Sequence, residues 1–121
     1  MKTLIRIAFI AASALLTAAP ASSQSSKVTN VIKMAAWAQV LAHKCPKLEM
    51  NWTRYGTIMN IVGLEPADIE PSGKHGKLHG AFIAEALSET KDSSEAVVCA
   101  TGLTLYGRNG RNAPGLLAPK S

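Results

Sequence analysis

The sequence predicts an all-α fold: a small domain of three to four helices, cross-linked by one disulfide, after a cleaved signal peptide. Three observations lead to this prediction. Apolar residues recur at steps of three and four in four separate segments, which is the spacing of one face of a helix. No run of alternating β-branched residues indicates a sheet. Two cysteines, Cys45 and Cys99, follow an N-terminal export signal.

The first residues have the parts of a secretory signal peptide. A short basic region precedes an apolar run over 7–19, and small residues follow. We expect a signal peptide over 1–21, cleaved after Ala21, or after Ser23 as an alternative. A retained membrane anchor is disfavoured, because a spanning helix needs about 20 apolar residues. The mature protein is therefore expected in the periplasm or outside the cell, with no membrane span.

The net charge of the mature chain is modest. The full chain of 121 residues carries a formal charge of +5, and removal of Lys2 and Arg6 with the signal lowers it to about +3. Nucleic-acid binding requires a basic stripe with stacking aromatic residues. Here the charges alternate in blocks and only 5% of residues are aromatic, so we expect no nucleic-acid partner.

The two cysteines are expected to pair with each other. An exported chain reaches an oxidising compartment, where disulfides form and persist. A Cys45–Cys99 bridge would close a loop of roughly 55 residues, and chain entropy assigns such a loop about 4 kcal/mol of stability. A redox-active pair usually has Cys-x-x-Cys spacing, which this chain lacks. A bridge between two chains of a homodimer stays open at this point.

The first helix of the mature chain is expected over 28–44. Pro46 stops it, because the residue before a proline disfavours helical dihedral angles. Met34, Trp37 and Leu41 widen its apolar stripe, which indicates either central burial or an exposed patch for a partner. Trp37 is accordingly a partner-binding candidate. The stripe itself consists of Val28, Val31, Ala35, Ala38, Ala42 and Cys45.

A second, shorter helix is expected between Asn51 and Gly63. Asn51 is a favourable N-cap, and Gly63 is a favourable residue just after a helix end. The proline-bounded stretch over 65–73 is expected to be a loop with one helical turn, because Pro66 suits a first helical position.

Two further helices are expected after this loop. The third starts between Ser72 and Leu78 and runs to Thr90, its start weakened by three glycines. The fourth starts after Asp92, which forms a capping box with the glutamate three residues later, and it ends at Gly107.

These elements give a helical domain over 22–107 and a basic, turn-rich C-terminal tail over 108–121. In this tail an apolar hook, Leu116 and Leu117, is able to pack back on the domain. Arg108 and Arg111 join Trp37 as partner-binding candidates.

Two histidines are weak candidates for a metal site. His75 and His79 are four residues apart, which places both imidazoles on one face of a helix, and His43 is a candidate third ligand. Nearby glycines weaken the helix, no glutamate completes a His-Glu-x-x-His motif, and adjacent lysines repel a cation. We therefore expect solvated histidines, with no metal and no cofactor.

No catalytic motif is present in the sequence, so we expect no enzyme. Residues for serine-hydrolase chemistry occur without a Gly-x-Ser-x-Gly elbow. The acidic residues at 85, 89, 92 and 95 are more typical of a solvated face than of an acid–base pair.

The combination of export, small size and helical content favours a non-enzymatic binding or stress-response module, with another protein as its partner. In layout alone, without a shared motif, the chain resembles the small, helical, single-disulfide acid-stress chaperones of the bacterial periplasm. This resemblance implies that acid would loosen the fold and uncover apolar surface. The alternatives are a secreted partner or effector of an envelope or host complex, and a metal-binding carrier using His75 and His79.

Overall fold

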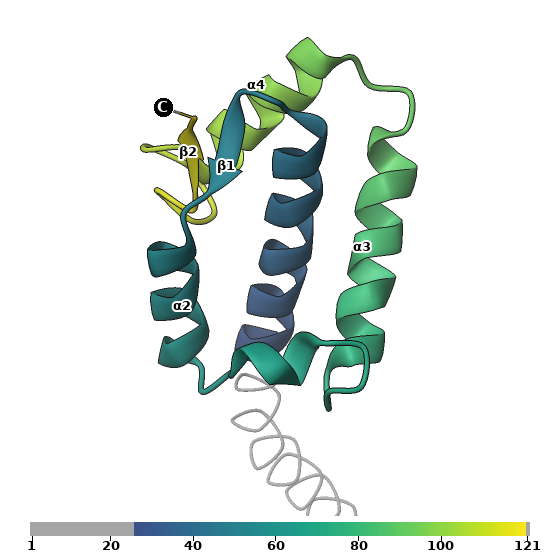
Figure 1. Ribbon diagram of the computed structural model, residues 1–121, viewed down its shortest axis with the longest axis vertical. Helices are drawn as coiled ribbons and strands as arrows, with labels where there is room; N and C mark the ends of the chain where they lie inside the picture. The colour runs from purple at the N-terminus through teal and green to yellow at the C-terminus, as the bar shows by residue number, and fades with distance from the viewer. Residues whose placement is uncertain (1–25, 121) are drawn as a thin grey trace, which may run out of the picture.

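A computed structural model describes residues 26–120 and shows a mostly helical molecule built around one central helix over 26–44. In Figure 1 this central helix lies between α2 and α3, and α4 crosses near its C-terminal end. The predicted signal peptide and its cleavage sites at Ala21 and Ser23 lie outside the described residues. After the central helix the elements are β1 (Leu48–Met50), α2 (Trp52–Ile61), the 3-10 helix η1 (Pro66–Ile69), α3 (Gly76–Thr90), α4 (Glu95–Tyr106) and β2 (Leu117–Pro119).

The central helix is buried around most of its circumference. Of the two alternatives that the sequence left open, central burial is the one found. Its alanines let neighbouring elements approach the helix backbone closely, and Leu41 is fully buried. The helix ends before Cys45, whose backbone N–H donates to the Leu41 carbonyl at 2.9 Å. The buried residues of this helix are Ile32, Ala35, Ala36, Ala38, Val40 and Leu41.

The predicted ends of α2 are confirmed. The Asn51 side chain accepts a hydrogen bond from the Arg54 backbone N–H at 3.1 Å, as an N-cap does. At the other end Gly63 has a φ of 76°, and the Leu64 N–H donates to the Met59 carbonyl at 2.9 Å. This is the Schellman arrangement, which requires a left-handed residue and so favours glycine.

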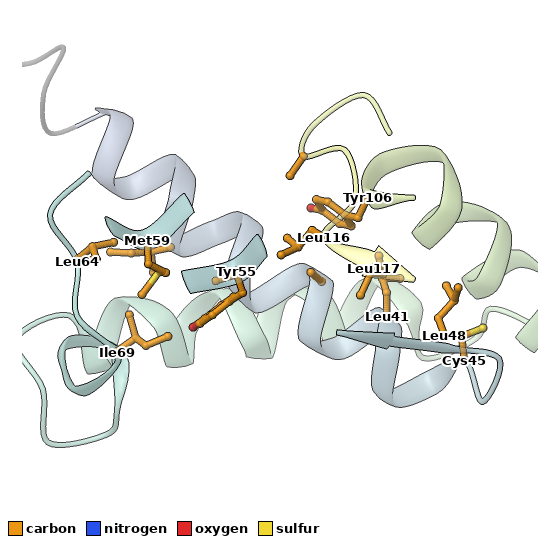
Figure 2. Close-up of a cluster of buried hydrophobic side chains, with 14 of the residues drawn as sticks. Leu41, Cys45, Leu48, Tyr55, Met59, Leu64, Ile69, Tyr106, Leu116 and Leu117 are labelled. Atoms are coloured by element: carbon orange, nitrogen blue, oxygen red, sulfur yellow. The ribbon is translucent and has the colours of Figure 1, made fainter. Parts of the chain in front are cut away.

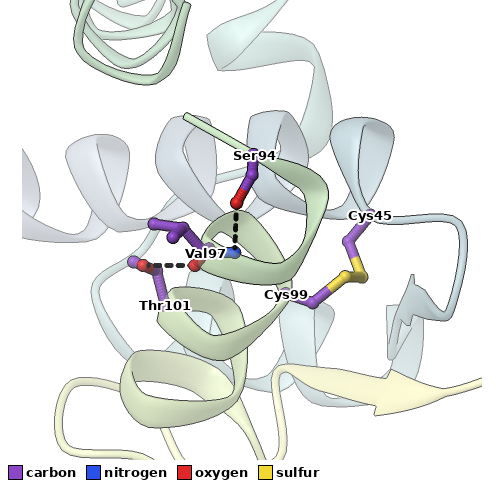
Figure 3. The surroundings of a disulfide bond; sticks show 5 residues. All are labelled: Cys45, Ser94, Val97, Cys99 and Thr101. Atoms are coloured by element: carbon purple, nitrogen blue, oxygen red, sulfur yellow. Dashed lines mark hydrogen bonds between the residues drawn. A yellow bond between two sulfur atoms is a disulfide. The ribbon is translucent and has the colours of Figure 1, made fainter. Parts of the chain in front are cut away.

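The start of α4 corrects the sequence prediction. Ser94, not Asp92, is the N-cap, and its Oγ accepts from the Val97 N–H at 3.2 Å (Figure 3). Asp92 instead lies in a turn closed by a bond from the Ser93 N–H to the Thr90 carbonyl at 3.1 Å. The chain therefore needs two more residues to turn into the helix than the capping-box pattern indicated.

A two-stranded antiparallel sheet is present, so the prediction of an all-α fold is wrong in this part. Strand β1 pairs with β2 in the register Leu48 to Pro119, Glu49 to Ala118 and Met50 to Leu117. The pairing is extended at one end by the Lys120 N–H, which donates to the Lys47 carbonyl at 2.9 Å. Each strand has only three residues and lacks β-branched side chains, so the local sequence did not predict either strand.

The leucine hook of the tail packs into the core, as expected (Figure 2). Leu116 and Leu117 are fully buried together with side chains of the central helix, β1, α2 and α4. These two leucines are therefore unavailable to a partner in the folded domain. A partner-binding use of the tail is confined to its exposed residues.

The disulfide joins the end of the central helix to α4 within one chain, as predicted (Figure 3). The Cα atoms of Cys45 and Cys99 are 5.2 Å apart, and Cys45 is fully buried. In residues 26–120 the helices are too short or too polar to cross a membrane.

Candidate functional site

An open groove of about 770 Å³ lies between the central helix, α2, the end of α4 and the tail. Its volume is in the range of about 300–1,000 Å³ that is typical of small-molecule sites. The central helix contributes Asn30, Val31, Lys33, Met34 and Trp37; α2 contributes Arg54 and Ile58; α4 contributes Leu105 and Tyr106; and the tail contributes Arg111, Asn112, Ala113 and Pro114.

Helical spacing explains why these side chains meet. Asn30, Lys33 and Trp37 follow at steps of three and four, so they share one face of the central helix. Arg54 and Ile58 are four apart and share one face of α2. The tail closes the groove because its buried leucines hold it against the domain.

The groove has a positive character. Three basic residues line it, and its lining includes no acidic residue. The positive charge of Lys33 is partly offset by Glu85, because the Lys33 Nζ lies 3.7 Å from Glu85 Oε2. The offset is only partial, since both side chains are substantially exposed and water screens the pair. Arg54 and Arg111 make no ion pair within residues 26–120. The uncompensated charge of the groove is therefore that of the two guanidinium groups.

Arg54 is held by the tail. Its Nε donates to the Pro114 carbonyl at 3.2 Å, across 60 positions of the chain. This bond uses one of the five N–H donors of the guanidinium, the one on Nε. The four donors on the two Nη atoms are not used by this bond.

Trp37 is held from the side of α3. Its Nε1 donates to Glu85 Oε2 at 2.9 Å in a partly buried contact. The Lys33 ammonium lies 5.7 Å from the centre of the Phe82 ring, also on α3, at the distance of a cation–π contact. These contacts orient one edge of the groove.

Tyr106 supplies a protonated phenol to the groove lining. Burial raises the pKa of Tyr106 above its ordinary value, and a hydrogen bond with the Asn112 side chain lowers that pKa by a smaller amount. The phenol is therefore neutral at physiological pH.

The structure brings together two of the three partner-binding candidates from the sequence. Trp37 and Arg111 both line the groove, whereas Arg108 is exposed and outside its lining. Sequence reasoning missed Lys33 and Arg54. Lys33 lies four residues before Trp37, and this spacing could have placed it beside Trp37 on the same helix face. Arg54 gave no such indication, because an arginine on an amphipathic helix usually lies on a solvated face.

The candidate metal ligands do not form a cluster. His75 is the N-cap residue of α3 and His79 lies one turn into the helix, with its N–H bonded to the His75 carbonyl at 3.0 Å. In the part of the chain that the structure describes, no three His, Cys, Asp or Glu residues are placed to bind a metal ion, so His43 does not complete the pair.

His79 has an unusual environment for a histidine. Its Nε2 is buried and has no hydrogen-bond partner within residues 26–120. Burial lowers the pKa of His79 below its ordinary value, because the charged imidazolium is poorly solvated there. Its protonation therefore opposes the folded state.

Several large apolar side chains are exposed outside the groove. Leu103 and Val97 on α4 are about half exposed, at 48% and 54%, so α4 is apolar on its outer side as well as its inner side. A helix that is apolar on all sides is typical of a buried element or of one that meets a partner. The exposed set consists of Trp52, Ile61, Leu87, Val97 and Leu103.

The chain matches no protein-family model, and no curated protein or solved structure matches it at a significant level. Function is therefore inferred from the side chains of the groove and their surroundings.

Proposed function

We propose that this protein is an exported, non-enzymatic binding module of the periplasm or the extracellular space, and that the groove is its binding site. The observation that carries the proposal is the groove itself. It combines a pocket-sized volume, a mostly apolar lining and a few convergent polar groups, which are the features of ligand sites.

The side chains of the groove favour binding over catalysis. Its lining residues include no histidine, carboxylate, serine or cysteine. Those are the side chains that supply most general acids, bases and nucleophiles. Arginine, asparagine, tyrosine and tryptophan, which the groove has, are well suited to recognising a ligand.

A paired substitution on α2 tests the groove as a binding site. Ile58→Trp fills the groove, whereas Ile61→Trp changes a residue on the same helix that is 75% exposed and outside the groove. We expect saturable binding of the neutral apolar dye N-phenyl-1-naphthylamine to the native protein and the Ile61 variant, and weaker binding to the Ile58 variant. Circular dichroism checks that both variants fold. Equal dye binding by all three proteins would overturn the proposal, and so would a native protein that binds neither this dye nor decanoate nor 1-decanol.

A second candidate function is that of an acid-stress chaperone. The exposed apolar residues of α4 favour it, and so does the buried Nε2 of His79, which has no hydrogen-bond partner within residues 26–120. Acid would charge His79 and loosen the packing around it. This function requires two results at pH 2–3: increased binding of an apolar dye, and suppression of the aggregation of an acid-denatured client protein. Failure of either measurement would exclude it.

A further inference from the structure

The two uncompensated arginines of the groove indicate the charge of its ligand. Arg54 and Arg111 line it from different elements, one on α2 and the other in the tail. Arginine donors form bidentate hydrogen bonds with planar oxyanions such as carboxylates. Because Pro114 already holds the Nε of Arg54, the Nη donors of this residue are partly preorganised for such a group.

The rest of the lining indicates an apolar body for that ligand. Val31, Met34 and Trp37 on the central helix are partly buried, and Ile58 and Leu105 belong to the same groove. Methionine adapts to ligands of irregular shape, and tryptophan offers a broad apolar surface. A purely polar anion would leave these side chains unused.

We infer that the groove binds a small amphipathic anion, with its carboxylate head at Arg54 and Arg111 and its apolar body along the central helix and Ile58. This inference rests on the proposed function and names the chemical class of its ligand. Medium-chain and long-chain fatty acids and aromatic carboxylates belong to this class. The net positive lining attracts the anion, and its volume of about 770 Å³ suits a single small molecule.

The test compares two probes of equal chain length that differ in the head group. Decanoate carries a carboxylate, and 1-decanol is neutral. In a Trp52→Phe background Trp37 is the only tryptophan, so its fluorescence reports occupancy of the groove. We expect decanoate to bind at least tenfold more tightly than decanol, and its affinity to fall as the salt concentration rises.

Substitutions of the arginines locate the head group. Arg54→Gln and Arg111→Gln are each expected to weaken decanoate binding about tenfold and to leave decanol binding unchanged. Arg54→Lys, which keeps the charge but lacks the planar fork of donors, should lose less affinity. Arg108→Gln is the matched control, because it removes the same charge from the same tail outside the groove lining. Circular dichroism confirms the folding of each variant.

The outcomes separate this inference from the proposed function. Equal affinity for decanol and decanoate, or an Arg108 effect as large as those of Arg54 and Arg111, overturns the inference about the anionic head but leaves the groove as a binding site. If neither probe nor the naphthylamine dye binds, both the inference and the proposed function are wrong.

Discussion

Trp37 and Glu85 join the central helix to α3 through a hydrogen bond of 2.9 Å from the indole Nε1 to the carboxylate Oε2. The same oxygen lies 3.7 Å from the Lys33 ammonium. One carboxylate outside the groove therefore orients the largest aromatic ring of the groove and offsets the nearest of its positive charges.

Replacement of Glu85 tests this relationship. We expect Glu85→Ala to lower the free energy of unfolding by about 1 kcal/mol, because it removes a partly buried, charge-assisted hydrogen bond. It should also change the emission of Trp37, measured in the Trp52→Phe background. Glu89→Ala, at an exposed position on the same helix, should do neither. Identical emission from the two variants would argue against a Trp37–Glu85 bond in solution.

The disulfide should supply a large part of the stability. Replacing Cys45 and Cys99 together by alanine releases a cross-link between residues 54 positions apart. We expect a loss of about 4 kcal/mol in the free energy of unfolding, measured by urea denaturation, and a similar loss for the native chain under reducing conditions. The intact mass with and without reductant provides the control. A reductant-sensitive dimer would instead show that the bridge joins two chains.

Two substitutions test whether Ser94, as in the structure, or Asp92, as in the sequence prediction, caps α4. Ser94→Ala should lower the free energy of unfolding by about 1 kcal/mol, because the Val97 N–H loses its acceptor. Asp92→Ala should have a smaller effect, since Asp92 does not cap the helix. Thermal unfolding of both variants measures the difference. The opposite ranking would restore Asp92 as the capping residue.

The tail should behave as part of the domain core. Leu116→Ala removes a fully buried side chain and should cost about 2–5 kcal/mol, whereas Leu103→Ala, at a half-exposed position on α4, should change stability by no more than about 0.5 kcal/mol. Urea denaturation of both variants tests this contrast. A near-neutral Leu116 variant would mean that the tail is dispensable to the fold.

His79 should make the protein less stable in mild acid. Because its pKa in the folded state lies below the ordinary value of 6.5, the unfolded chain takes up the proton first as the pH falls. Stability is therefore unaffected by this group well above pH 6.5 and decreases as the pH falls below it. His79→Leu should flatten the dependence of the free energy of unfolding on pH between 7 and 5.

The exposed His43 provides the control for this measurement. His43→Leu should keep the steeper pH dependence of the native chain. If both histidine variants show the native dependence, the burial of His79 does not affect stability.

The elements that the sequence predicted correctly depend on local signals. Pro46, Asn51 and Gly63 each mark a helix end through the dihedral angles or hydrogen bonds of their immediate neighbours. The cap of α4 was misplaced because Asp92 and Ser94 are both good capping residues, and the turn after Thr90 decides between them.

The sheet and the groove depend on contacts between distant parts of the chain. Strand β1 acquires its partner only when the leucine hook enters the core, and Arg54 meets Pro114 across 60 positions. Trp37 and Arg111 were identified separately as candidates, but nothing in their local sequence indicated that they share one site. The sheet and the groove therefore depend on long-range packing, which helical periodicity and capping signals do not predict.

The pairing of β1 with β2 also affects when the protein is able to fold during its synthesis. Residues 117–119 complete both the sheet and the core, although the central helix that they cover is made much earlier. A nascent chain that lacks them is expected to leave apolar side chains of that helix uncovered. We therefore expect the chain to reach the described fold only after residues 117–119 have emerged from the ribosome.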